Sequence, residues 1–211
     1  MSVRNLFIKL TMFFIFSLGM TNVAYAGGDA AAGEALSVAC GACHGQDGAT
    51  GLDPSYPNLA GQNEKYLLYQ LTLIQSDVRA IPLMAGQLVG KSAQDLADIA
   101  AFFASLPGKV SQANGDDAAI AKAAKIYRGG IAAKGVAACS ACHNPNGGGN
   151  AQAGFPRLSG QPSTYTINQL TAYREQIRDT DENVGGMMRG VAEGLTDTEI
   201  ALVADYIQGL N

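Results

Sequence analysis

The chain has 211 residues, a length that suits one domain or two small ones. Acidic residues outnumber basic ones by 18 to 14, and the formal net charge is −4 at pH 7. Nucleic-acid-binding proteins carry a basic footprint, so this balance argues against that class. All four cysteines and both histidines lie in two pentapeptides, so we expect the chemistry of the chain to be there.

Residues 1–26 have the pattern of a secretory signal peptide. Arg4 and Lys9 precede an apolar run from Leu10 to Met20, and Ala24-Tyr25-Ala26 forms an A-x-A cleavage site. The run is short for a membrane span, although an uncleaved anchor is the alternative. We predict cleavage after Ala26, which brings the formal charge to −6, and export of a soluble chain to the periplasm.

The predicted elements are all helical. Asp29 can cap a helix that runs through alanine-rich residues into Cys40. Apolar spacing predicts a second helix over 64–76, and Ser92-x-x-Asp95 opens a third with a capping-box pattern. No convincing strand follows from the pattern, so we predict an all-α fold.

The first pentapeptide, Cys40-Gly-Ala-Cys43-His44, is repeated as Cys139-Ser-Ala-Cys142-His143. C-x-x-C-H is the attachment signature of c-type haem, in which both thiols bond to the porphyrin and the histidine binds the iron. A thioredoxin-like pair needs a βαβ context, which is absent. A four-cysteine zinc site or two disulfides would also use the four thiols, but neither requires the histidines. We therefore predict two covalently bound haem c groups.

The second half of the chain repeats the first. Cys40 and Cys139 are 99 positions apart, and the Pro-x-Leu-x-Gly-Gln segments at 57–62 and 156–161 keep that offset. Near the C-terminus the offset becomes 104, with the extra residues before Met188. A Pro- and Gly-containing linker separates the copies. In the second copy we expect helices after Asp116 or Asp117, over Tyr165–Tyr173 and after Thr196.

Each half also offers a methionine as the second axial ligand. After removal of the signal peptide only Met84, Met187 and Met188 remain. Met84 precedes Leu96 by 12 residues and Met188 precedes Ile200 by 12, a register that favours Met188 over Met187. A lysine, a terminal amine, an open position or a core-filling Met84 are the alternatives. We predict His44 with Met84 and His143 with Met188 as iron ligands, a set that raises the reduction potential.

Further polar residues are candidates for contacts around the haem groups. The Pro57 and Pro156 carbonyls can accept the N–H of the ligating histidines. Several side chains can either reach haem edges and propionates or serve packing and surface roles: Tyr66, Gln70, Arg79, Arg157, Tyr165, Gln169 and Arg189.

Together these residues resemble the cytochrome c4 family. The most specific stretches are 40–45, 154–161, 188–192 and 206–210. The resemblance implies two tandem class I cytochrome c domains, at 27–109 and 118–211, joined by a linker at 110–117. It also implies that the propionate edges of the two haem groups meet at the domain interface.

The resemblance implies a periplasmic electron carrier, often membrane-associated, rather than an enzyme. Its implied partners are quinol-cytochrome c reductase as donor and terminal oxidases or other periplasmic redox enzymes as acceptors. With no spare cysteine or histidine we expect no catalytic residue. The chain would otherwise be a dihaem subunit of a larger oxidoreductase, such as flavocytochrome c sulfide dehydrogenase, or a haem enzyme such as a peroxidase, which needs an open axial position.

Overall fold

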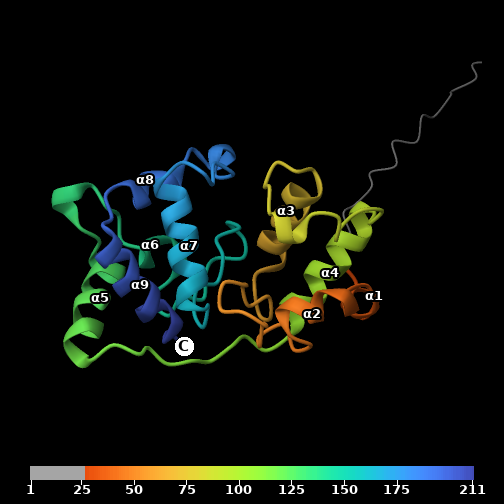
Figure 1. The fold of residues 1–211 in the computed structure, drawn as a ribbon, viewed down its shortest axis with the longest axis horizontal. Helices are drawn as coiled ribbons and strands as arrows, with labels where there is room; N and C mark the ends of the chain where they lie inside the picture. Colours follow the sequence, from red (N-terminus) through yellow and green to blue (C-terminus); the bar gives the residue numbers. More distant parts are fainter. Residues whose placement is uncertain (1–26) are drawn as a thin grey trace, which may run out of the picture.

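The computed structural model describes residues 27–211, so the predicted signal peptide at 1–26 lies outside the described residues. Within 27–211 the chain is helical and contains two isolated β-bridges but no strand, which confirms the all-α prediction. No helix in this part of the chain is long and apolar enough to cross a membrane. The helices gather in two lobes, which we call the N-terminal half and the C-terminal half (Figure 1).

The N-terminal half contains four α-helices and two 3₁₀ turns. Its α-helices are α1 (Ala30–Leu36), α2 (Gly41–His44), α3 (Glu64–Gln75) and α4 (Ala93–Ser105), and its 3₁₀ turns are η1 (Val38–Cys40) and η2 (Pro82–Met84). Helix α4 packs against both α1 and α3.

Two of the predicted helix starts in this half are confirmed. The Asp29 carboxylate accepts hydrogen bonds from the first turn of α1, and Ser92 and Asp95 form a capping box on α4. The prediction of one helix from Asp29 into Cys40 is wrong. Helix α1 ends at Leu36, because the Ser37 N–H bonds back only three residues to the Glu34 carbonyl and the chain tightens into η1.

The C-terminal half repeats this plan with five α-helices. They are α5 (Asp117–Gly129), α6 (Ser140–His143), α7 (Ser163–Arg174), α8 (Met187–Glu193) and α9 (Asp197–Gln208). Asp116 caps α5, and Thr196 with Glu199 forms the predicted capping box on α9. The predicted helix over Tyr165–Tyr173 lies within α7, where Thr166, Leu170 and Tyr173 are buried.

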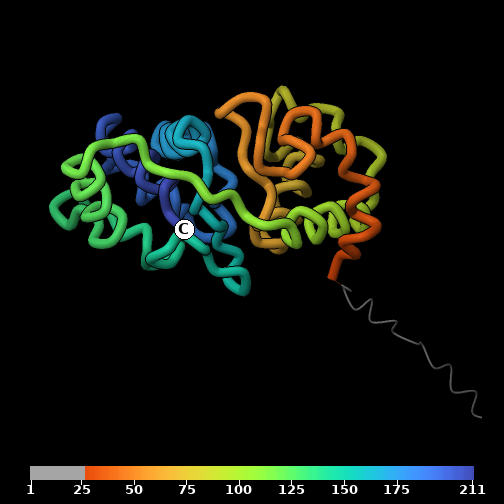
Figure 2. Tube along the Cα trace, turned by 90° about the horizontal axis from the view of Figure 1, so that it is seen from below, coloured from red at the N-terminus to blue at the C-terminus, as the bar shows by residue number. Residues whose placement is uncertain are grey.

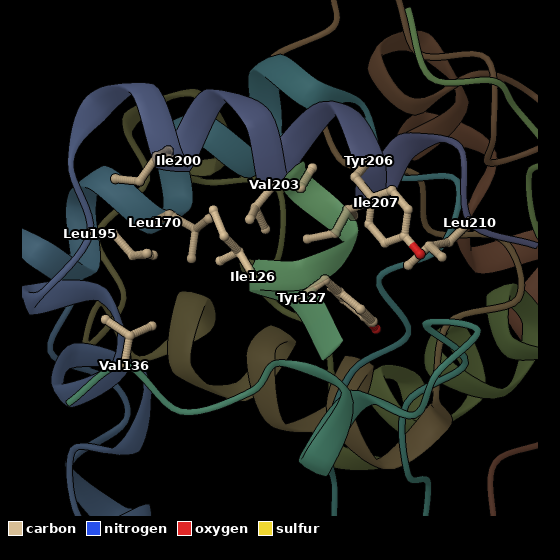
Figure 3. Packing of buried hydrophobic residues seen from close by; sticks show 11 residues of the cluster. Ile126, Tyr127, Val136, Leu170, Leu195, Ile200, Val203, Tyr206, Ile207 and Leu210 are labelled. Carbon is tan, nitrogen blue, oxygen red and sulfur yellow. The ribbon is translucent and has the colours of Figure 1, made fainter. Parts of the chain in front are cut away.

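Helix α9 lies across α5 and α7 and forms the core of the C-terminal half (Figure 3). Ile200, Val203, Ala204 and Ile207 of this helix are buried. Opposite it, Tyr127 of α5 is fully buried and donates its hydroxyl proton to the Asn144 carbonyl at 2.8 Å. The buried cluster of this half has 11 hydrophobic residues, whereas that of the N-terminal half has four.

Residues 107–116 form no helix and connect α4 to α5 along one side of both lobes (Figure 2). The Asp205 carboxylate of α9 accepts hydrogen bonds from the main chain of Asn114 and Gly115. Gly160 has a φ of +74°, and a Cβ there would lie 2.1 Å from the Lys109 carbonyl oxygen. The connection is therefore held closely against the C-terminal half.

Candidate haem sites

Each C-x-x-C-H pentapeptide forms a single helical turn. Cys40 precedes α2, and Cys43 and His44 lie within it. Cys139, Cys142 and His143 have the same places at α6. Both histidines are buried, with 7% and 6% of their surface exposed, whereas Cys43 and Cys142 are exposed. One turn thus buries the histidine and leaves a cysteine thiol exposed on the same turn.

A proline carbonyl orients each histidine. The Nδ1 of His44 lies 3.0 Å from the Pro57 carbonyl oxygen, and the Nδ1 of His143 lies 2.9 Å from that of Pro156. These contacts confirm the predicted proline partners. Burial lowers the pKa of both imidazoles, and the proline carbonyls only partly oppose it. A neutral ring that donates from Nδ1 keeps its Nε2 lone pair available for a metal.

The two pentapeptides lie far apart in the fold. Helices α2 and α6 belong to different lobes (Figure 1), and within residues 27–211 no disulfide joins any two of the four cysteines. A single zinc site built from both C-x-x-C pairs needs the four thiols in one place, which this arrangement does not provide. Burial raises the pKa of the Cys40 thiol, and it raises that of Cys139 to about 11.

The methionines differ in their surroundings. Met84 ends η2 and is half-buried between exposed neighbours such as Leu83. Met188 is the second residue of α8, after Met187, and it packs against the hydrophobic cluster of the C-terminal half. Met187 is 40% exposed. The packing therefore agrees with the sequence register in singling out Met188.

A ring of two arginines and two glutamines joins the halves. The Arg79 guanidinium donates to Gln70 Oε1 at 2.7 Å and to Gln169 Oε1 at 3.0 Å. Arg178 donates to the same two oxygens, at 3.0 and 2.7 Å, and to the Tyr66 hydroxyl at 3.1 Å. Each glutamine oxygen therefore binds one guanidinium from each half. The sequence prediction missed Arg178, although its position 99 residues after Arg79 was a signal for it.

The ring carries positive charge without a carboxylate. Within residues 27–211 no Asp or Glu forms an ion pair with Arg79 or Arg178. The buried Nε of Arg178 has no hydrogen-bond partner among these residues. A buried cation of this kind needs an anionic partner, and the propionates of haem have the required chemistry.

The remaining arginine candidates have different surroundings. Arg189 pairs with Asp181 at 2.6 Å and also with Glu182, so carboxylates of the chain already neutralise it. Arg157 lies at the interface, where its main chain bonds to Gln62 and its buried Nε has no partner within the described residues.

Comparison with known proteins identifies this architecture. The family model described as cytochrome c matches residues 120–211. Cytochrome c4 of Pseudomonas aeruginosa is 46% identical over 203 residues, which cover 96% of this chain and 99% of that protein. The chain belongs to the cytochrome c4 family. Cytochromes c4 are dihaem c-type proteins that transfer electrons, and the two C-x-x-C-H turns fit two covalent haem c groups.

The fold agrees with this family. The crystal structure of reduced cytochrome c4 from Pseudomonas stutzeri has a TM-score of 0.83 and 45% identity, over 87% of this chain and all of that one. The class I cytochrome c fold is thereby confirmed. A thiosulfate dehydrogenase electron acceptor of Stutzerimonas stutzeri is more distant, with 32% identity over 81% of this chain and 78% of that protein.

Proposed function

We propose that this cytochrome c4 is a periplasmic electron carrier with two haem c groups, bound through Cys40 and Cys43 and through Cys139 and Cys142. The proposed iron ligands are His44 with Met84 and His143 with Met188. The proposed domains are 27–109 and 118–211, with a linker at 110–117. The observation that carries the proposal is the repeated, buried histidine whose Nδ1 is bound by a proline carbonyl.

The residues of each half suit outer-sphere electron transfer. A bound haem c supplies a one-electron couple between ferric and ferrous iron. The histidine is held rigidly by its proline, and a methionine thioether favours the ferrous state. With a histidine and a methionine both bound to the iron, O₂ and peroxide would have no free coordination site. The buried Arg178 guanidinium and the half-buried Arg79 guanidinium would hold the propionates between the halves. They would thereby fix the position of one haem relative to the other.

The ligand assignment is tested by replacing each methionine in turn. Met84→His should lower the reduction potential of the first haem by more than about 59 mV, because a second imidazole favours ferric iron. This shift corresponds to a fall of more than about tenfold in the reduction equilibrium constant. Met188→His should do the same at the second haem. The measurement is an optical redox titration, together with the far-red charge-transfer band that reports methionine bound to ferric iron.

Met187→Leu is the matched control, since Met187 is adjacent in sequence but exposed. It should leave both the band and the potentials unchanged. An intact charge-transfer band for the first haem in Met84→His would reject Met84 as a ligand. If the band of the second haem is lost in Met187→Leu and kept in Met188→His, Met187 and not Met188 is the ligand of the second haem.

The donors and acceptors we propose are soluble or membrane-bound redox partners of a respiratory chain, with quinol-cytochrome c reductase and terminal oxidases as the first pair to test. A role as acceptor for a dehydrogenase is a second candidate, because one relative is named as a thiosulfate dehydrogenase electron acceptor. Stopped-flow reduction by each purified donor separates these roles. Co-purification with a flavoprotein would instead favour a role as the subunit of a larger enzyme.

A further inference from the structure

The proline that holds each histidine shares a peptide group with a residue at the interface between the halves. The Pro57 carbonyl accepts from His44, and the N–H of the same peptide group belongs to Asn58. That N–H donates to Oε1 of Gln161, 3.0 Å away in the C-terminal half. A continuous chain of hydrogen bonds therefore runs from the imidazole through one peptide group to a side chain of the other half.

The same chain exists in the opposite direction. The Pro156 carbonyl accepts from His143, and the N–H of that peptide group belongs to Arg157. It donates to Oε1 of Gln62 at 2.7 Å, in the N-terminal half. Gln62 and Gln161 are the final residues of the two Pro-x-Leu-x-Gly-Gln segments. Each copy of this segment thus bonds its own histidine through its proline carbonyl. Its glutamine bonds the peptide group that holds the histidine of the other half.

Both glutamines are fixed and shielded from water. Gln62 is 5% exposed and Gln161 is 7% exposed. Their amide groups donate back to the partner main chain, Gln62 to the Arg157 carbonyl at 2.8 Å and Gln161 to the Asn58 carbonyl at 2.7 Å. These return bonds determine which amide atom is the acceptor. At a site shielded from solvent, where the local dielectric constant is low, successive hydrogen bonds polarise one another more strongly than in water.

We propose that Gln161 tunes the haem bound by His44, and that Gln62 tunes the haem bound by His143, each across the interface. An acceptor on the peptide N–H makes the carbonyl oxygen of that peptide group more negative. The carbonyl then draws more strongly on the Nδ1 proton, and the imidazole donates more electron density to the iron. This favours ferric iron and lowers the potential. The inference rests on the proposed ligation by His44 and His143.

A crossed pair of variants tests the proposal. Gln161→Leu should raise the reduction equilibrium constant of the first haem about threefold and leave that of the second haem nearly unchanged. At 59 mV per tenfold change, this is a rise in potential of about 28 mV. Gln62→Leu should do the reverse. Haem methyl NMR resonances followed through a redox titration distinguish the two groups. The amide proton of Asn58 should shift upfield in Gln161→Leu, because it loses its acceptor.

Asn63→Ala is the control for a loosened interface, because the Asn63 side chain donates across it to the Phe155 carbonyl and not to the peptide groups that follow Pro57 and Pro156. The variant keeps the main-chain N–H of residue 63, which donates to Gln62 Oε1. It should move neither potential. Equal shifts of both haem groups in each glutamine variant, a shift in Asn63→Ala of the same size, or no shift would overturn the proposal. If the leucine variants do not fold, Gln161→Glu and Gln62→Glu provide the same crossed test with lowered potentials.

Failure of the underlying ligation is recognised separately. His44→Ala should lose low-spin ligation or the first haem itself. If it keeps a native low-spin spectrum, the proposed function fails at that site. If His44→Ala behaves as expected while the glutamine variants leave the potentials unmoved, only the tuning across the interface is wrong.

Discussion

Arg178 places a guanidinium in the interface with only 7% of its surface exposed. It lies over the Tyr173 ring, with its central carbon 4.6 Å from the ring centroid. Burial works against ionisation of Tyr66, yet Arg178 and then Arg79 outweigh it and hold the Tyr66 pKa below its ordinary value. Within residues 27–211, then, the neutral partners of this residue do not cancel its charge.

Removing that charge should lower the potentials of both haem groups. Arg178→Gln is expected to lower each potential by an amount on the order of 1 kcal/mol, because a buried positive charge stabilises the additional electron of a reduced haem. Optical redox titration measures this. Arg128→Gln removes the same charge from an exposed position and should have a smaller effect. Unmoved potentials in Arg178→Gln would show that the ring does not act on the haem groups.

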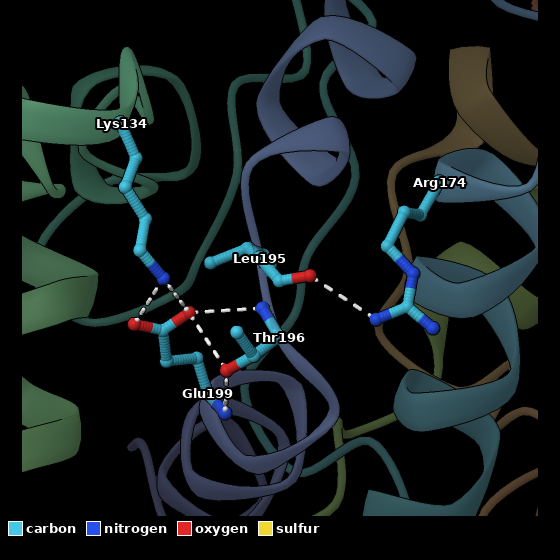
Figure 4. Close-up of polar contacts among 5 residues, drawn as sticks. All are labelled: Lys134, Arg174, Leu195, Thr196 and Glu199. Carbon is cyan, nitrogen blue, oxygen red and sulfur yellow. Dashed lines mark hydrogen bonds and ion pairs between the residues drawn. The ribbon is translucent and has the colours of Figure 1, made fainter.

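The start of α9 shows how one helix end is secured. Lys134 Nζ lies 2.7 and 2.8 Å from the Glu199 carboxylate oxygens, and Glu199 also accepts from the Thr196 N–H (Figure 4). Arg174 of α7 donates to the Leu195 carbonyl at 3.1 Å. The Lys134 hydrogen bond, followed by that from Thr196, lowers the Glu199 pKa to about 2.

Glu199→Gln should therefore destabilise the protein in a pH-dependent way. The lowered pKa means that ionised Glu199 stabilises the fold above its ordinary value of 4.5, and that this effect is lost as the pH falls towards about 2. At pH 7 we expect a loss of about 1 kcal/mol, typical of a cap with a partly exposed ion pair. The difference from the native chain should vanish near pH 2.

Guanidinium unfolding at several pH values measures this difference. Asp197→Asn is the matched control, because Asp197 is 90% exposed where it pairs with Arg174. It should change stability less. A destabilisation of Glu199→Gln that is equal at pH 7 and near pH 2 would contradict the role of the ionised carboxylate.

Across the whole molecule the two halves share a plan but differ in how their buried hydrophobic residues cluster. The C-terminal half buries 11 clustered hydrophobic residues and the N-terminal half four. Met188 packs against the larger cluster, and the Asp181 carboxylate accepts from the main-chain N–H of the next residue, Arg189, at 2.9 Å. Met84 lies in a short turn beside Leu83 and near Val89, which are 71% and 81% exposed.

We therefore expect the first haem to lose its methionine ligand before the second as guanidinium is added. Buried apolar area is the main stabilising contribution, and local opening begins where that burial is least. The loss is followed by the charge-transfer band and by resolved methionine resonances in NMR spectra of the reduced protein. Simultaneous loss at both sites would mean that the interface makes the halves one cooperative unit.

Local chemistry explains which features could be predicted from the sequence. The pentapeptides, the caps at Asp29, Ser92 and Thr196, and the repeat are patterns in which the interacting residues are close in the chain or spaced identically in both copies. The histidine–proline bonds belong to the same class, since each spans 13 residues within one copy. The break of the first helix at Ser37 was missed, because alanine-rich propensity does not show where a turn tightens.

Only the tertiary structure shows the side-chain contacts that join one copy of the repeat to the other. Residues 90 or more positions apart meet in the ring of Arg79, Gln70, Arg178 and Gln169, and a repeat cannot show that its copies face each other. From the sequence, Gln62 and Gln161 are known only as equivalent positions of the two Pro-x-Leu-x-Gly-Gln segments. Their amide groups satisfy the main chain of the opposite half, because those polar groups are buried where the two copies pack together. The haem motifs could therefore be predicted from the sequence alone. The connection between the two sites could not, because it depends on how one half packs against the other.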